Sequence, residues 1–157
     1  MRRKDREVTD KQEIFNIMKK CDVCSLAVLD DTFPYIVPVN FGISLQNDKF
    51  TLYFHGAEAG TKYNLIKKNP HAAFEMNCSR KLITGEKACN YSMEYESVCG
   101  NGIIEILERE EKLGALTILM SQYSKNGEIY EFDEKAVAAT TVYKLTVHEI
   151  SGKRHIK

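Results

Sequence analysis

The sequence predicts one mainly β domain of the α+β class, in which about six antiparallel strands form a small barrel with three to four helices around it. Apolar segments rich in β-branched and aromatic residues alternate with turn sequences, and the helical segments are few and well separated. The long strand expected at Tyr95–Leu107 is interrupted by Gly100-Asn-Gly102, which favours the bulge or bend that barrels need. Residues 1–157 are enough for one domain with a sizeable core, and we expect residues 1–20 to form an N-terminal arm and helix.

Each expected element is defined by its apolar period and by the turn or cap residues beside it. In chain order we expect a helix ending near Lys19-Lys20, strands at 24–29, 34–41 and 50–54, a short helix from Thr61, strands at 71–77 and 95–107, helices at 108–123 and 132–140, and a last strand at 141–150. Thr9 and Gln12 have the spacing of a capping box for the first helix. Residues 79–90 are polar without a regular period, so we expect a long loop there.

Pro38 lies in the middle of the expected strand at 34–41. Proline has no backbone N–H to donate to a ladder, so this strand is expected to be interrupted or to lie at a sheet edge. Either arrangement leaves neighbouring backbone groups free to meet something else.

The charge balance and the apolar pattern disfavour several classes of protein. With 22 basic and 22 acidic residues, the formal net charge is zero, which disfavours nucleic-acid binding. No apolar run approaches the length of a membrane span, and the charged start Met1–Glu7 is not followed by the apolar segment of a signal peptide. Five cysteines, an odd number, indicate reduced thiols rather than a disulfide frame, so we expect a cytoplasmic protein.

Cys21 and Cys24 have the spacing of a thioredoxin-like redox site. In such sites the pair opens a helix, whose dipole lowers the thiol pKa. Here the pair closes a helix and opens a strand, so we expect structural, unreactive cysteines. No second pair at ligand spacing is present, and no metal site is expected.

The segment Leu52–Asn69 predicts an anion-binding cradle. It begins as an apolar strand, passes through a loop that contains Gly56 and Gly60, and enters a helix whose first turn carries Lys62. Backbone N–H groups at a helix start attract phosphate, and the lysine adds a full charge. The loop by itself is a general signal, because its glycines lack the Walker or dinucleotide spacing.

Two residues of this segment leave alternatives open. His55, at the strand end, is either an exposed hairpin residue or a side chain that projects beside the cradle. Lys62 is either part of a solvated helix face with Lys67 and Lys68 or the ligand of an anion, which would remove its conflict with the helix dipole. Glu58 would repel phosphate if it pointed inward, so we expect it to face solvent.

Four stretches, taken in order, carry a family resemblance. The chain resembles the FMN-binding split β-barrel proteins related to pyridoxamine 5′-phosphate oxidase, and more closely the branch that contains the nitroimidazole-resistance (Nim) reductases. The four stretches are Met1–Glu7, Pro34–Phe41, Leu52–Ala57 with Gly60–Lys62 and Asn69-Pro70, and Tyr95–Gly100. The resemblance covers roughly the first two-thirds of the chain, and it implies a six-stranded antiparallel split β-barrel.

The resemblance also implies a homodimer with two FMN sites at the subunit interface. It places the isoalloxazine ring along Val37, Pro38, Val39, Asn40 and Phe41. It places the FMN phosphate in the cradle, with His55, Gly56, Ala57, Gly60, Thr61 and Lys62 as cofactor-binding residues. The partner subunit would contribute Tyr95, Glu96, Ser97 and the tail around Lys153-Arg154. His55 would be catalytic, orienting or protonating a substrate.

The function expected from this resemblance is an FMN-dependent oxidoreductase that passes electrons to a small electrophile, with nitroaromatic compounds as one candidate class. The arginine and lysine that vitamin B6 oxidases use for their substrate are not evident, which puts pyridoxamine phosphate as substrate in doubt. The alternative is a non-catalytic flavin-, haem- or deazaflavin-binding protein of the same fold. A nucleic-acid-binding barrel is disfavoured by the neutral charge and by the lack of an aromatic platform.

Overall fold

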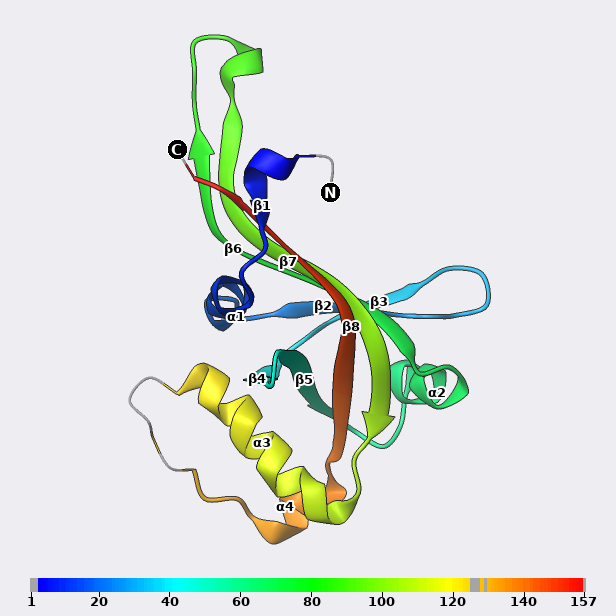
Figure 1. Cartoon of the computed structure of the whole chain (residues 1–157). Helices are drawn as coiled ribbons and strands as arrows, with labels where there is room; N and C mark the ends of the chain where they lie inside the picture. Colours follow the sequence, from blue (N-terminus) through cyan, green and yellow to red (C-terminus); the bar gives the residue numbers. More distant parts are fainter. Residues whose placement is uncertain (1–2, 125–127, 129, 157) are drawn as a thin grey trace.

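The computed structural model describes residues 3–124, 128 and 130–156, which form eight strands, four α-helices and two short 3-10 helices (Figure 1). In chain order they are η1 (Lys4–Arg6), β1 (Glu7–Val8), α1 (Lys11–Lys19), β2 (Cys24–Val28), β3 (Tyr35–Val39), β4 (Gly42–Gln46), β5 (Lys49–Gly56), α2 (Thr61–Lys68), β6 (His71–Ile83), η2 (Ala88–Asn90), β7 (Ser92–Ile106), α3 (Arg109–Tyr123), α4 (Glu134–Ala139) and β8 (Thr141–His155). The expectation of a mainly β domain with three to four peripheral helices is therefore confirmed.

All eight strands belong to one antiparallel sheet. Seven follow the order β3-β2-β6-β7-β8-β5-β4, and β1 pairs with β8 beside this path. The sheet is not closed, because its end strands β3 and β4 do not pair with each other. The count differs from the six strands expected, because Glu7–Val8 and Gly42–Gln46 also form strands. Gly42–Gln46 is the first arm of the hairpin whose turn, at Asn47 and Asp48, has positive φ at both residues.

The edge position expected for Pro38 is confirmed. Strand β3 is an end strand of the sheet path, and Pro38 lies opposite Ser25 of its single neighbour β2. Strand β2 alternates between buried and half-buried residues, so one of its faces is only partly covered. Its two neighbours within the sheet are β3 and β6.

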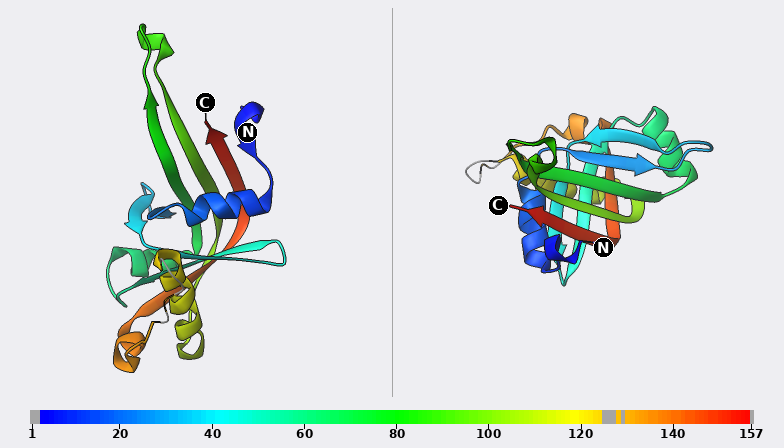
Figure 2. Two further views of the ribbon diagram at one scale, coloured as in Figure 1. Left: turned by 90° about the vertical axis from the view of Figure 1, so that its left-hand side faces the viewer. Right: turned by 90° about the horizontal axis from the view of Figure 1, so that it is seen from above.

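Residues 79–90 do not form the long loop that was expected. Strand β6 continues to Ile83 and pairs with the start of β7, for example Leu82 with Met93, so that the β6–β7 hairpin extends beyond the rest of the fold (Figure 2). The positive φ of Ser79 and a register shift between Cys78 and Lys81 break the period of two that a sequence pattern needs. Both Leu82 and Met93 are exposed, so no buried face imposes an apolar alternation there.

The bulge expected at Gly100-Asn-Gly102 is confirmed. The register between β7 and β8 shifts between Asn101 and Gly102. A side chain at Gly102 would collide with the backbone oxygen of Thr146, which explains why the close approach of the two strands requires glycine.

Helix α1 covers one face of the sheet with its apolar residues Ile14, Ile17 and Met18 (Figure 2). Its N-cap is Asp10, whose carboxylate accepts a hydrogen bond of 2.8 Å from the backbone N–H of Glu13. The expected cap at Thr9 is wrong by one residue, because Asp10 and Glu13 repeat the same cap pattern one position further along.

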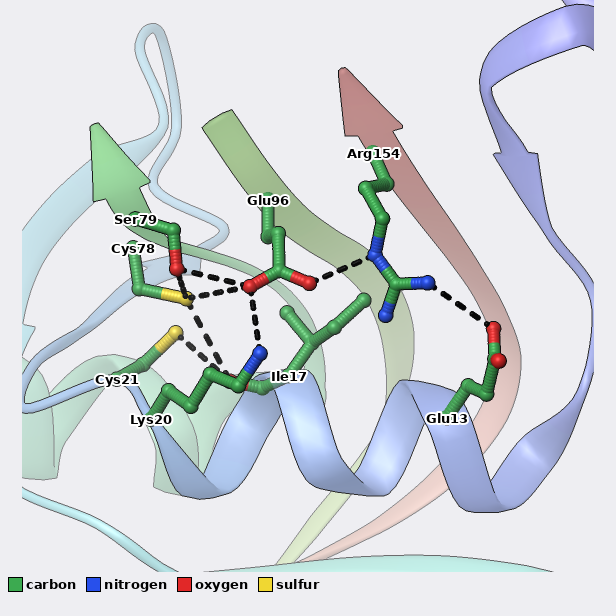
Figure 3. Close-up of polar contacts among 8 residues, drawn as sticks. All are labelled: Glu13, Ile17, Lys20, Cys21, Cys78, Ser79, Glu96 and Arg154. Carbon is green, nitrogen blue, oxygen red and sulfur yellow. Dashed lines mark hydrogen bonds and ion pairs between the residues drawn. The ribbon is translucent and has the colours of Figure 1, made fainter. Parts of the chain in front are cut away.

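Next to helix α1, the buried carboxylate of one glutamate contacts side chains from several elements. Glu96 of β7 is only 1% exposed, and its carboxylate accepts hydrogen bonds from Lys20 (2.8 Å), Ser79 (2.8 Å) and Arg154 (2.7 Å) (Figure 3). Burial raises the pKa of Glu96, but these three donors outweigh it and hold the pKa at about 2. Arg154 is also paired with Glu13 of α1 at 3.3 Å. The charge is thus fully partnered, and it fastens α1 to β6, β7 and β8.

We expect this carboxylate to control the acid stability of the fold. Its pKa is depressed in the folded protein, so its contribution is present above the ordinary glutamate pKa and is lost as the pH falls from about 4.5 to 2. Glu96→Gln should lower the free energy of unfolding at pH 7 by about 3 kcal/mol and weaken its dependence on pH in that window. Urea denaturation between pH 2 and 7 measures both quantities.

Glu105→Gln is the matched control for this experiment. Glu105 lies on the same strand but is half exposed, and it pairs with Lys144 at the surface. The loss of this surface ion pair should lower the free energy of unfolding by less than about 1 kcal/mol. Equal effects of the two substitutions would contradict the assignment of a buried, fully paired Glu96.

Candidate functional site

The start of α2 presents an open and uncapped set of backbone groups. Strand β5 ends at Gly56, and Gly60, the residue before the helix, has φ of 95°, which favours glycine. Among the residues that the structure describes, no side chain caps the helix, and apart from its chain neighbours nothing lies within 4 Å of where a Cβ of Gly60 would stand. The free N–H groups of the first turn are therefore accessible to an anion, as the sequence predicts.

Lys62 lies across the end of β5 without a counter-ion. It is half-buried, its ammonium donates to the carbonyl oxygen of His55 at 3.2 Å, and it lies 5.1 Å from the ring centre of Tyr143. It forms no ion pair with any residue that the structure describes. Burial lowers the pKa of Lys62, because the charged form loses hydration. Such a cation is suited to hold an anion.

Gly56 makes this position of Lys62 possible. A Cβ on Gly56 would lie 3.0 Å from the Lys62 ammonium and 3.7 Å from a ring carbon of Tyr143. The absence of a side chain therefore lets the lysine and the tyrosine meet above the strand end.

His55 is exposed and lies opposite Val142 of β8. Partial burial lowers the pKa of its imidazole, and the positive charge of Lys62 lowers it further. The imidazole is therefore neutral at pH 7, where it can either donate or accept a hydrogen bond. Lys62 contacts the backbone oxygen of His55, and the imidazole ring has no hydrogen-bond partner among the described residues.

Glu58 faces solvent, as expected. Its carboxylate accepts a hydrogen bond of 3.3 Å from the hydroxyl of Tyr63, and it forms no ion pair with Lys62. The loop carboxylate therefore does not neutralise the lysine. Ala57 and Thr61, also expected to bind the cofactor, are exposed on either side of it.

The expected ring platform on β3 is partly accessible. Pro38 and Asn40 are exposed, whereas Val37 and Val39 are half-buried against the main core. Phe41 is fully buried, so its side chain belongs to the core.

A tyrosine that sequence reasoning missed holds the end of this platform in place. The hydroxyl of Tyr123 in α3 accepts hydrogen bonds from the backbone N–H of Phe41 (3.0 Å) and from the side chain of Asn40 (3.2 Å). The contact spans more than 80 residues of sequence, so no local pattern indicates it.

The stretch Tyr95–Ser97 points to both faces of β7. Tyr95 and Ser97 lie opposite His155 and Lys153, and the ammonium of Lys153 is 5.4 Å from the centre of the Tyr95 ring. A hydrogen bond from Lys153 lowers the pKa of Tyr95. Glu96 points the other way, into the ion cluster described above. Of the two basic tail residues, Arg154 is committed to that cluster, and Lys153 shares a face with Tyr95.

The family of the chain follows from comparison with known proteins. A family model described as pyridoxamine 5′-phosphate oxidase matches residues 10–154. The chain belongs to this family. A solved structure of a candidate 5-nitroimidazole antibiotic resistance protein from Bacteroides thetaiotaomicron is 34% identical, with a TM-score of 0.79, over 94% of this chain and 85% of that one. The similarity agrees with the branch that the sequence indicates.

Two more distant structures share the fold of this pyridoxamine 5′-phosphate oxidase family member. An FAD and heme binding protein from Mycobacterium smegmatis is 18% identical, with a TM-score of 0.82, over 97% of this chain and 74% of that one. The flavocytochrome Anf3 from Azotobacter vinelandii is 18% identical, with a TM-score of 0.81, over 100% of this chain and 72% of that one. No curated protein matches the sequence.

The two halves of the expected flavin site are far apart within one chain of this family member. His55 lies opposite Val142 and Tyr95 opposite His155, at the two ends of β8. At about 3.3 Å per residue, the path along β8 from Val142 to His155 is on the order of 40 Å. Figure 1 shows α2 near one end of the sheet and the chain termini near the other. Tyr95 and Ser97 therefore do not join the cradle within one chain.

Cys21 and Cys24 have the character expected of structural cysteines in this family member. Both are buried, and burial raises the pKa of Cys21 and raises that of Cys24 to about 12. The Cys21 thiol donates to the carbonyl oxygen of Ile17 at 3.4 Å (Figure 3). Buried thiols with raised pKa values are unreactive.

Other possible sites lie outside the predicted one. A cavity of about 780 Å³ lies between α3 and residues 130–138 and is lined by residues such as Leu113, Phe132 and Val137, none of which the sequence singles out as a site. Among the described residues, no group of three His, Cys, Asp or Glu side chains is placed to hold a metal ion. No described helix is both long enough and apolar enough to cross a membrane.

We expect the charge of Lys62 to be measurable at His55. The imidazole pKa should lie below its ordinary value of about 6.5, and Lys62→Met should raise it, because the substitution removes the positive charge and keeps the apolar bulk. An NMR titration of the imidazole protons gives both values. Lys67→Met, a change on the exposed side of the same helix, should leave the His55 titration unchanged. A His55 pKa that is insensitive to Lys62→Met would contradict this geometry.

Proposed function

We propose that the protein is a homodimeric, FMN-dependent oxidoreductase that reduces a small electrophile, with nitroaromatic compounds as the first class to test. The observation that carries the proposal is the half-buried Lys62, without a counter-ion, at an uncapped helix start in a chain of this family. The 34% identity to a candidate 5-nitroimidazole resistance protein supports the choice of substrate class.

The residues present fit the cofactor. Lys62 and the N–H groups at the uncapped start of α2 would hold a phosphate group, since open space lies beside Gly60 there. The exposed positions around Pro38 on β3 would lie along the ring. Bound FMN would supply the redox chemistry, and the protein would hold and tune it.

His55 is the residue proposed to act on the substrate. Its neutral imidazole is exposed beside Lys62, so it can donate or accept a hydrogen bond and orient a nitro or carbonyl oxygen. Because the positive charge of Lys62 disfavours protonation, an anion bound at Lys62 would raise the pKa of His55. The binding of the cofactor would thereby prepare His55 to transfer a proton.

The homodimer is proposed because one chain cannot complete the site. Tyr95 and Ser97 lie at the far end of β8 from the cradle, and only a second copy could bring them to it. We propose the cytoplasm as its compartment, which the free cysteines support.

The binding of FMN tests the proposal directly. Purified protein is mixed with FMN, freed of excess cofactor, and examined by visible absorbance and thermal melting; at about 100 times its dissociation constant, FMN should stabilise the protein by about 2.7 kcal/mol. Lys62→Met should weaken FMN binding by roughly ten- to a hundredfold, because a charge-assisted contact is lost. Lys67→Met is the matched control and should bind normally. No retained flavin and no thermal shift in the unmodified protein would end the proposal.

A second function is favoured by the fold shared with an FAD and heme binding protein and a flavocytochrome. On this alternative, the protein binds a flavin, deazaflavin or haem without turnover.

His55→Ala separates the two functions. If the protein is a reductase, this variant should keep FMN and lose turnover of a nitroaromatic, assayed with NADH or NADPH, by roughly a hundredfold or more. His148→Ala, a change of another exposed histidine, should leave turnover intact. Loss of haem binding in His55→Ala, together with no turnover in the unmodified protein, would instead identify a haem ligand.

A further inference from the structure

One buried hydroxyl group of the fold has no hydrogen-bond partner. Tyr143 of β8 is 1% exposed, and its hydroxyl meets no donor or acceptor among the residues that the structure describes. A buried polar group without a partner costs free energy, and nearly all such groups in native proteins are satisfied. The hydroxyl therefore calls for an explanation.

Tyr143 lies directly beneath the anion-binding cradle. It is opposite Phe54 in the β5–β8 pairing, so its ring lies on the face of the sheet that carries this core residue. A ring carbon lies 3.7 Å from where a Cβ of Gly56 would stand, and the ammonium of Lys62 is 5.1 Å from the ring centre. The side chain thus extends between the strand end and the first turn of α2.

The Tyr143 hydroxyl keeps its proton and can therefore donate a hydrogen bond. Burial raises the pKa of Tyr143 to about 12, and the nearby Tyr63 and Glu58 contribute to the same direction. The group is therefore protonated at physiological pH, and the ring that carries it lies 3.7 Å from where a Cβ of Gly56 would stand. A neutral O–H beside a cation without a counter-ion complements an anionic oxygen.

We propose that Tyr143 is a further anion-binding residue of the cradle, with its hydroxyl and the Lys62 ammonium directed to one phosphate monoester group. Neither group needs the other for folding, since the lysine is satisfied only by a carbonyl and the hydroxyl by nothing described. The identity of the ligand as FMN rests on the proposed function, whereas the pairing of the two groups on a phosphate does not.

Tyr143→Phe tests the proposal, because it should preserve or raise the stability of the ligand-free protein and weaken the binding of a phosphate-bearing ligand. Without ligand, the variant should melt at the same temperature as the unmodified protein or higher, because it removes only an unpartnered hydroxyl. FMN should bind roughly tenfold or more weakly, and riboflavin, which lacks the phosphate, should bind equally well to both proteins. Calorimetry and thermal melting provide these values, and melting in inorganic phosphate provides a measurement that does not depend on flavin.

Tyr53→Phe is the matched control. Tyr53 lies on the neighbouring strand β5, and its register with Lys144 places it on the opposite face from Phe54 and Tyr143. This variant should change neither FMN nor phosphate binding. A comparison of Tyr53→Phe with Tyr143→Phe distinguishes a specific role of the Tyr143 hydroxyl from the general effect of losing a tyrosine hydroxyl in this strand pair.

The outcomes separate the two proposals. Protein that binds no FMN but is stabilised by phosphate, less so in Tyr143→Phe, would end the proposed function and support the anion role of Tyr143. Unchanged binding of both FMN and phosphate in Tyr143→Phe would overturn that role. A lower melting temperature of the ligand-free variant would also overturn it, because the hydroxyl would then be satisfied within the fold.

Discussion

The length of strand β8 is the constraint on which the rest of the structure depends. The first residues of this fifteen-residue strand pair with β5, and nearly its whole length pairs with β7. The cradle at the end of β5 and the Tyr95 segment of β7 therefore lie beside opposite ends of the same strand. Each residue of a strand adds about 3.3 Å, and no change of rotamer can shorten that distance. The anion cradle at Gly56 and the cationic face around Tyr95 are therefore held apart rigidly. A site that needs both must be assembled from two chains.

The buried charge of Glu96 and the half-buried charge of Lys62 have opposite surroundings. Glu96 is surrounded by three donors from different elements, so its charge is stabilised in the folded protein alone. Lys62 meets only a carbonyl oxygen and the face of an aromatic ring. Removing charge from water without a full set of partners is unfavourable. The ion cluster of Glu96 stabilises the fold. The charge of Lys62 is only partly compensated and can attract an anionic ligand.

The sequence predicts those features that depend on local period and local backbone chemistry. The edge position of Pro38, the bulge before Gly102 and the helix starting at Thr61 all follow from neighbouring residues. Where the period breaks, as at the positive φ of Ser79, the sequence predicts a loop at 79–90 in place of the outer part of the β6–β7 hairpin. The contact of Tyr123 with Asn40 and the missing partner of Tyr143 depend on residues far apart in sequence or on an absence, which no pattern can show.

The ligand-free cradle holds two polar groups that the fold does not require. Replacing a buried polar group that lacks a partner by an apolar one of similar shape is generally neutral or stabilising. Phenylalanine in place of Tyr143 would fill the same space beneath α2, and the core there already contains Phe54. The fold alone therefore gives no reason for a hydroxyl beside Lys62. An anion that accepts from both groups does give one, since it satisfies the donor and the cation with a single set of oxygens.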